Sequence, residues 1–187
     1  MGLSGFQLKY LPSEMSFFNH LRYLCLRYNE LSEFSNYFVF PQKLENLDLR
    51  NNKFSIFPDN LKDLPNLKKL FLSENQITAI SDNIGHLINL EELYLSKNLI
   101  QDISDNIGLL KNLKVLILDN NSIISIQKSI IGLVSLEELD LSCNKILEVP
   151  EEIKNLKNLE KLNLRYNKIK IIPNVLFEFK NNQSFLF

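Results

Sequence analysis

An eleven-residue motif recurs along this chain at a constant interval of 23 residues. The copy at residues 90–100 reads Leu-Glu-Glu-Leu-Tyr-Leu-Ser-Lys-Asn-Leu-Ile, so the pattern is L-x-x-L-x-L-x-x-N-x followed by a large apolar residue. Seven copies, without insertion or deletion, begin at Leu21, Leu44, Leu67, Leu90, Leu113, Leu136 and Leu159. A fixed interval of about 20–50 residues is typical of a solenoid, whose repeats pack only on their neighbours.

The interval predicts one continuous domain over residues 1–187, which corresponds to about eight stacked units. We expect residues 1–20 to be an atypical N-terminal unit, because only part of the motif is present there. Residues 21–169 carry the seven copies, and residues 170–187 are predicted to form a C-terminal return arc and a partial strand. A return arc is defined here as the segment between one motif copy and the next.

Within each motif, alternation of leucine with other residues predicts a short β-strand. Leu93 and Leu95 would point into the core, whereas Tyr94 would point to the opposite face. Strands separated by one return arc each must run parallel in one sheet. The arcs carry apolar residues at three-residue spacing and prolines such as Pro58 and Pro150, which favours short 3₁₀ turns. Because these arcs are bulkier than strands, we expect the sheet to line a concave face.

The first return arc departs from this pattern at residues 35–41. Phe38 takes the usual apolar position, but a proline stands where later arcs have the next leucine. We therefore expect Tyr37, Val39 and Phe40 to point outward on the convex side. The alternatives are local repacking near the end of the solenoid and a second binding patch.

The last residues of the chain predict a strand edge without a polar cap. Phe185 and Phe187 fall at the positions that Leu162 and Leu164 occupy one repeat earlier. An uncapped edge presents unpaired backbone groups to a second molecule. Either the chain closes this edge itself, or a homodimer forms through the C-terminal edge.

An asparagine occupies the ninth position of every motif copy, and we call this row the asparagine ladder: Asn29, Asn52, Asn75, Asn98, Asn121, Asn144 and Asn167. The chain turns into the stack at this point, where backbone N–H and C=O groups lack water. An asparagine amide carries both a donor and an acceptor and can satisfy such groups. We interpret the ladder as structural, against the alternative of a ligand-binding row.

The second motif position alternates in charge through most of the repeats: Arg22, Glu45, Lys68, Glu91, Lys114, Glu137 and Glu160. Opposite charges on neighbouring strands attract. We expect this column to pair with itself, each exposed pair contributing about 0.2–1 kcal/mol. The alternative is a charged recognition strip.

The fifth motif position lies between the two core leucines, and it reads Cys25, Asp48, Phe71, Tyr94, Ile117, Asp140 and Asn163. Three consecutive members are large and apolar, and Val115 lies beside them on the same face. Scattered surface hydrophobes are normal, but contiguous ones tend to mark a partner site. The predicted protein-binding residues of the concave face are Asp48, Phe71, Tyr94, Val115, Ile117 and Asp140.

Charge and cysteine usage bound the environment of the chain. Its 22 acidic and 21 basic residues nearly cancel, so no overall field favours nucleic acid or an anionic membrane. No apolar run approaches about 18 residues, and we expect no membrane span.

The two cysteines, Cys25 and Cys143, lie about 24 Å apart by strand spacing, too far for a disulfide. Unpaired cysteines and the lack of a signal-peptide pattern favour an intracellular, cytoplasmic protein. The alternative is an exported protein whose leader has been removed.

No motif for catalysis, cofactor or metal is found in the sequence. The five glycines form neither of the phosphate-binding glycine patterns. His20 and His86 have no second His or Cys at metal-binding spacing. Cys143 has no histidine nearby in the sequence that would activate a thiol nucleophile. We therefore expect no enzyme activity, no cofactor and no metal.

The repeated motif, with arcs that read Val-Pro or Ile-Pro before the next apolar positions, resembles the leucine-rich repeat family. Its 23-residue interval is most similar to the intracellular, Ras-group-like type. The resemblance implies an α/β leucine-rich repeat solenoid: a right-handed curved horseshoe with a parallel sheet on the concave face. Short 3₁₀, helical or extended arcs would form the convex face.

The resemblance also implies a non-catalytic module that binds another protein, usually on the concave face. We interpret the chain as an adaptor or regulator with a protein partner. The alternatives are a structural unit that assembles through its uncapped ends, and the same binding module exported as an effector or surface protein.

Overall fold

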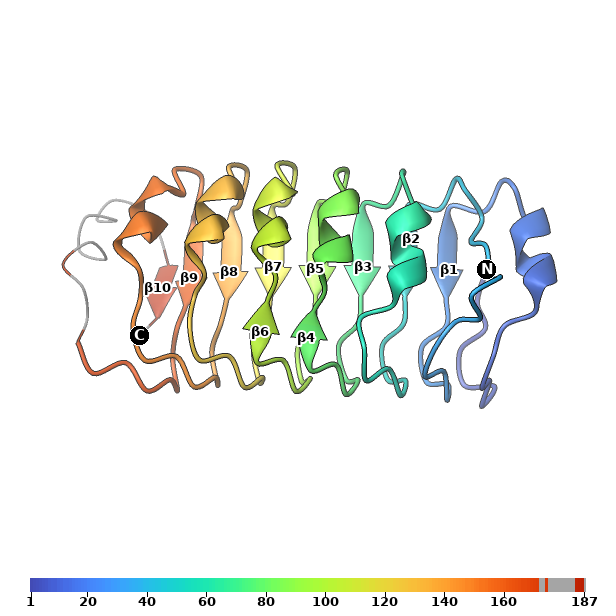
Figure 1. The fold of residues 1–187 in the computed structure, drawn as a ribbon, viewed down its shortest axis with the longest axis horizontal. Coiled ribbons are helices and arrows are strands. Elements are labelled where there is room, and N and C mark those ends of the chain that lie inside the picture. The colour runs from blue at the N-terminus through green and yellow to red at the C-terminus, as the bar shows by residue number, and fades with distance from the viewer. Residues whose placement is uncertain (172–173, 175–183, 187) are drawn as a thin grey trace.

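The computed structural model describes residues 1–171, 174 and 184–186, and it shows a solenoid built on one long parallel sheet (Figure 1). In spatial order, the eight strands of this sheet are β1 (Tyr23–Cys25), β2 (Asn46–Asp48), β3 (Lys69–Phe71), β5 (Glu92–Tyr94), β7 (Val115–Ile117), β8 (Glu138–Asp140), β9 (Lys161–Asn163) and β10 (Ser184–Leu186). Leu70 pairs with Leu93, and Leu93 pairs with Leu116. The strand register therefore equals the sequence interval, and the predicted parallel ladder is confirmed.

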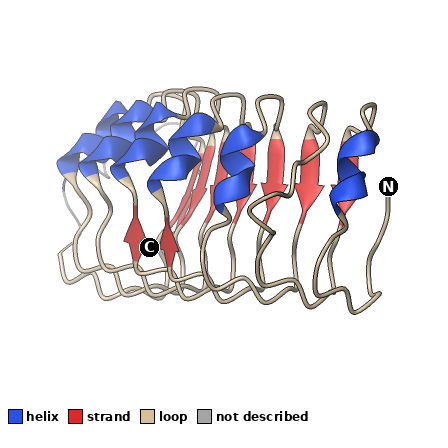
Figure 2. Cartoon of the chain, turned by 45° about the vertical axis from the view of Figure 1, so that its right-hand side comes forward, coloured by secondary structure: helices blue, strands red, loops and turns tan. Residues whose placement is uncertain are grey.

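Short 3₁₀ helices line the side of the solenoid opposite the sheet (Figure 2). They are η1 (Ser13–Phe17), η2 (Asp59–Asp63), η3 (Asp82–His86), η4 (Asp105–Leu109), η5 (Lys128–Gly132) and η6 (Glu151–Asn155). Pro58 precedes η2 and Pro150 precedes η6, where a fixed φ near −69° suits the helix start. The short strands β4 (Ala79–Ile80) and β6 (Asp102–Ile103) pair with each other in the arcs. The prediction of 3₁₀ arcs is confirmed.

The core is a continuous row of apolar side chains between the sheet and the arcs. Leu93 and Leu95 are 0% exposed, and so are their neighbours Leu90 and Ile100 in the same repeat. Burying one such side chain contributes about 1.5–3 kcal/mol. Among the described residues, no helix has the length and apolar character that crossing a membrane requires.

The first return arc contains a cluster of aromatic rings instead of a 3₁₀ helix. The expectation that Phe40 points outward is wrong, because its side chain is only 2% exposed. Its ring lies edge-on to those of Phe34 and Phe38, with 4.9 Å between centroids in both pairs. Phe40 therefore helps to fill the core beside an arc that lacks a helix. Tyr37, at 89% exposure, and Val39 point outward as expected.

The two ends of the described sheet differ in what covers them. At the N-terminal end, Gly2 forms a parallel bridge with Cys25, and the Leu3 N–H donates to the Cys25 carbonyl at 2.7 Å. The atypical first unit thus covers the edge of β1. At the other end, Phe185 pairs with Leu162 as predicted. Phe187 lies outside the described residues, and a homodimer through this edge stays a prediction.

Two glycines allow the backbones of η4 and η5 to approach closely. A Cβ on Gly132 would overlap the carbonyl of Gly108, and a Cβ on Gly108 would overlap the carbonyl of Ser129. At Gly85 the nearest atom is instead the end of the Leu109 side chain, which can move. The spacing of these two arcs therefore depends on the absence of a side chain at two positions.

We expect Gly132→Ala to destabilise the fold by about 1–3 kcal/mol, because backbone atoms cannot retreat from the added methyl group. Gly85→Ala is the matched control and should cost less. Thermal or urea unfolding of both variants measures the difference. Equal losses would mean that these arcs separate more easily than their packing indicates.

Candidate functional site

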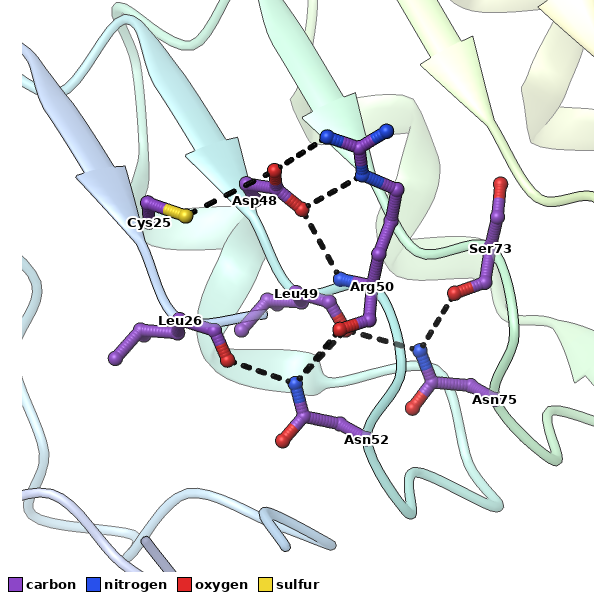
Figure 3. Close-up of polar contacts among 8 residues, drawn as sticks. All are labelled: Cys25, Leu26, Asp48, Leu49, Arg50, Asn52, Ser73 and Asn75. Atoms are coloured by element: carbon purple, nitrogen blue, oxygen red, sulfur yellow. Dashed lines mark hydrogen bonds and ion pairs between the residues drawn. The ribbon is translucent and has the colours of Figure 1, made fainter. Parts of the chain in front are cut away.

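Each residue of the asparagine ladder links its own turn to the preceding repeat. The Asn98 amide donates to the Leu95 carbonyl at 3.1 Å and to the Leu72 carbonyl at 3.0 Å. Its oxygen accepts from the Ile77 N–H at 2.9 Å. Asn52 makes the same set of bonds to Leu26, Leu49 and Leu31, part of which Figure 3 shows. The buried members of the ladder are Asn29, Asn52, Asn75, Asn98, Asn121 and Asn144, and Asn167 is partly buried.

The residue before each ladder asparagine adopts a left-handed backbone conformation. This set, with φ between 54° and 59°, comprises Tyr28, Asn51, Glu74, Lys97, Asn120, Cys143 and Tyr166. The conformation costs about 1–2 kcal/mol for most residue types. The position contains no glycine, and asparagine, which also favours this conformation, stands there only at Asn51 and Asn120, so the sequence signal for this turn was weak. The hydrogen bonds of the following asparagine offset the cost and hold the turn in place.

Asn98→Ala should lower the free energy of unfolding by about 1–3 kcal/mol, because it leaves buried backbone groups without partners. Gln76→Ala, at an exposed position of the preceding turn, should change it by less than about 0.5 kcal/mol. Thermal melts of the two variants provide the comparison. Indistinguishable melts would contradict the structural role of the ladder.

The charged column at the margin of the concave face pairs with itself in several repeats. Glu45 contacts Arg22 at 2.5 Å and Lys68 at 3.1 Å, and Glu91 contacts Lys114 at 3.6 Å. The hydrogen bond from Lys68 is the main cause that lowers the pKa of Glu45. These pairs are solvent-exposed, and such pairs contribute little to stability.

The predicted apolar residues lie together at the centre of the concave face, and we call Phe71, Tyr94, Val115 and Ile117 the apolar row. Phe71 is paired with Tyr94 on the next strand, and Tyr94 with Ile117 on the one after. The Phe71 and Tyr94 rings stack with centroids 4.9 Å apart and an interplanar angle of 11°. Val115 lies on the same strand as Ile117, two residues earlier. All four side chains are half-buried, so each keeps a face toward solvent.

Asp48 is not an exposed member of this site, contrary to the sequence prediction. Its side chain is only 2% exposed. Arg50 donates to both of its carboxylate oxygens, at 2.9 Å and 2.6 Å, and the Cys25 thiol lies 3.9 Å away (Figure 3). The Arg50 guanidinium also lies 5.0 Å from the centre of the Phe71 ring. Arg50 thereby neutralises the charge of Asp48 and borders the N-terminal end of the apolar row, next to Phe71.

Asp140 is half-buried and borders the other end of the apolar row, where it pairs with Ile117 across the strands. One carboxylate oxygen accepts from the Ser142 hydroxyl at 2.6 Å, and the other accepts from the Asn163 amide at 3.0 Å. Asp119 follows Ile117 by two residues and accepts from the Ser96 hydroxyl at 2.5 Å. Asp140 therefore keeps the position that the sequence predicted, at the border of the apolar row.

Tyr94 is the titratable residue of the apolar row. Its burial, together with the hydrogen bond that it donates to Glu92 at 3.0 Å, raises its pKa from 10.0 to about 12. Glu92 in turn pairs with Lys69 on the neighbouring strand at 2.6 Å. The phenol is therefore neutral at physiological pH and held in one orientation.

The raised pKa makes the folded state favour protonated Tyr94. Its contribution to stability is complete below about pH 10 and is lost as the pH rises toward 12. Tyrosinate absorbance is measured against pH for wild type and for Tyr94→Phe, and the difference between the two curves reports Tyr94 alone. We expect this difference to have its midpoint near pH 12. A midpoint near 10 would mean that Tyr94 is freely solvated.

A second row of asparagines, which the sequence analysis missed, lies at the edge where the chain enters each strand. Each member donates from its amide to the carbonyl of the residue 24 positions earlier, at 2.7–2.9 Å, and the row comprises Asn66, Asn89, Asn112 and Asn158. A polar groove of about 450 Å³ runs along this edge, lined also by Lys68, Glu91 and Lys114. The signal for this row was an asparagine directly before the first leucine of four motif copies.

Within the described part of the chain, no group of three or more His, Cys, Asp or Glu side chains could hold a metal ion.

Comparison with known families decides the identity of the repeat. A leucine-rich repeat profile matches residues 88–146 and 135–184, and a profile for two copies of the repeat matches residues 42–85 and 65–109. The first profile alone spans 97 of the 187 residues. The chain belongs to the leucine-rich repeat family. Leucine-rich repeat domains generally bind proteins and are typically non-catalytic. No curated protein matches this chain in sequence.

Solved leucine-rich repeat structures share the fold of this solenoid. A leucine-rich repeat protein of Leptospira interrogans is 26% identical over 97% of the chain, with a TM-score of 0.60. An internalin of Listeria monocytogenes is 25% identical over 97%, with a TM-score of 0.83. The plant peptide hormone receptor RGFR1, solved in complex with RGF2, is 30% identical over 100%, with a TM-score of 0.83. The chain spans 58%, 52% and 30% of the lengths of these three proteins.

Proposed function

We propose that this leucine-rich repeat domain is an adaptor or regulator that holds a segment of another protein against its concave face. The observation that carries the proposal is the apolar row of Phe71, Tyr94, Val115 and Ile117. The core does not need these residues, because the leucines on either side of Phe71, Tyr94 and Ile117 face inward and are fully buried, and so is Leu116 beside Val115. Contiguous apolar surface of this kind tends to mark a binding site.

The organisation of the row supports this proposal. Large aromatic side chains surrounded by polar groups are the composition expected at the centre of a protein interface. The stacked pair of Phe71 and Tyr94 is already ordered, so little side-chain entropy would be lost on binding. The plant receptor of the same fold, solved with a bound peptide hormone, provides a precedent from another protein.

We further propose that the protein is of the 23-residue intracellular, Ras-group-like type and works inside the cell. The unvaried interval supports this subtype. Cys25, on β1, and Cys143, after β8, are both free thiols, which suits a reducing compartment. A membrane-impermeant maleimide applied to intact cells should leave the partly exposed Cys143 unlabelled, whereas lysed cells should show labelling. Labelling in intact cells would support the exported alternative.

The binding proposal is tested by quantitative pull-down from a lysate of the source cells. Tyr94→Asp should abolish capture of the partner, because a charge would replace the centre of the apolar row. Ile88→Asp introduces the same charge at an exposed apolar position on a return arc and should leave capture intact. If both variants capture the same proteins as wild type, the concave face is not the binding surface.

Affinity for the captured partner adds a quantitative test. Phe71→Ala should weaken binding by at least about 1–2 kcal/mol. Its cost in folding stability should stay within about 1.5 kcal/mol, the range of one aromatic pair. A stability loss of several kcal/mol would show that the apolar row serves the fold instead.

A further inference from the structure

Two carboxylates, those of Asp119 and Asp140, lie beside the apolar row. Among the residues that the structure describes, neither Asp119 nor Asp140 forms an ion pair. Their hydrogen bonds come from neutral donors: a hydroxyl and an amide for Asp119, and a backbone N–H, a hydroxyl and an amide for Asp140. These donors orient the carboxylates without cancelling their charge.

Other carboxylates of the same sheet have cationic partners. Asp48, in the same column as Asp140, is neutralised by Arg50. Glu92 pairs with Lys69 at 2.6 Å, and Glu138 pairs with Lys161 at 3.0 Å. Asp119 and Asp140 differ from these three carboxylates because neither has a cationic partner among the described residues. Their negative charge is therefore left beside Ile117, at the C-terminal end of the apolar row.

Ile117 lies where the apolar and the charged groups meet. Across the sheet, Tyr94 is its neighbour on one side and Asp140 on the other. Along its own strand, Val115 precedes it and Asp119 follows it, all on the same face. Neighbouring strands are about 4.8 Å apart, so one extended segment can contact both kinds of group at once.

From this arrangement we infer that the concave face selects a protein segment that carries an arginine or lysine next to a large apolar side chain. The apolar side chain packs on Phe71, Tyr94 and Ile117, and the cation binds between Asp119 and Asp140. Charge complementarity of this kind raises the association rate and rejects acidic segments, which would bring like charges together. The inference rests on the proposed function, since it assigns the partner of the same face.

The probe for this inference is a displayed library of random linear peptides, selected on the full chain and counter-selected on Tyr94→Asp. We expect the enriched peptides to carry a basic residue within a few positions of a large apolar one. The tightest peptide is then measured beside a copy whose basic residue is replaced by glutamine. Wild type should bind the original about tenfold more tightly than the glutamine copy.

Asp119→Asn, Asp140→Asn and the double variant should lose this preference and bind both peptides alike. Asp119→Asn is the safer variant for folding, because the Ser96 hydroxyl and the exposed Asn120 amide can reorient around it. Glu148→Gln, which removes an exposed carboxylate from a return arc, is the matched control and should keep the preference. Thermal melts show that the variants remain folded.

The outcomes separate this inference from the function on which it rests. If the enriched peptides are neutral or acidic, or if the Asp variants keep the preference, the charge selection is wrong while binding at the apolar row stands. If no peptide distinguishes wild type from Tyr94→Asp, the proposed function fails as well.

Discussion

The hydrogen bonds of the asparagine ladder are the interaction on which the solenoid depends. Each amide satisfies backbone groups of its own turn and of the turn before it, as Asn98 does with Leu95, Leu72 and Ile77. The turn is buried, so no water is available to replace these bonds. Every repeat must therefore place its asparagine at the same level of the stack, and the unvaried interval of 23 residues is consistent with this requirement.

A fixed register divides the side chains of each strand into two sets with different constraints. The leucines of the inner set are fully buried and fill one continuous core. The outer set is not needed for the core, yet much of it is used within the chain. Arg50 binds Asp48 and covers one side of Phe71, and the charges at the second motif position pair across strands. What remains available to a partner is therefore smaller than the whole concave face.

That available surface is asymmetric along the solenoid. Its centre is the ordered stack of Phe71 and Tyr94. At one end, Arg50 neutralises the charge of Asp48. At the other end lie Asp119 and Asp140, which accept hydrogen bonds from neutral donors and keep their negative charge. A surface with an apolar centre and uncompensated negative charge at only one end would favour one orientation of a bound segment over its reverse. Orientation is a form of specificity that a uniformly apolar row would lack.

The period, the parallel strands, their register and the burial of the leucines could all be predicted from the sequence, because each follows from a local backbone pattern repeated without change. It also placed Tyr94, Ile117 and Asp140 on one face, since alternation along a strand decides the face. Three features could not be predicted: the neutralisation of Asp48, the inward position of Phe40 and the contact of Gly132 with the backbone of a neighbouring arc. The first two outcomes depend on which neighbour a side chain reaches, and the third depends on how closely two backbones approach. A periodic pattern gives the position of a Cβ atom but not the direction of the side chain beyond it.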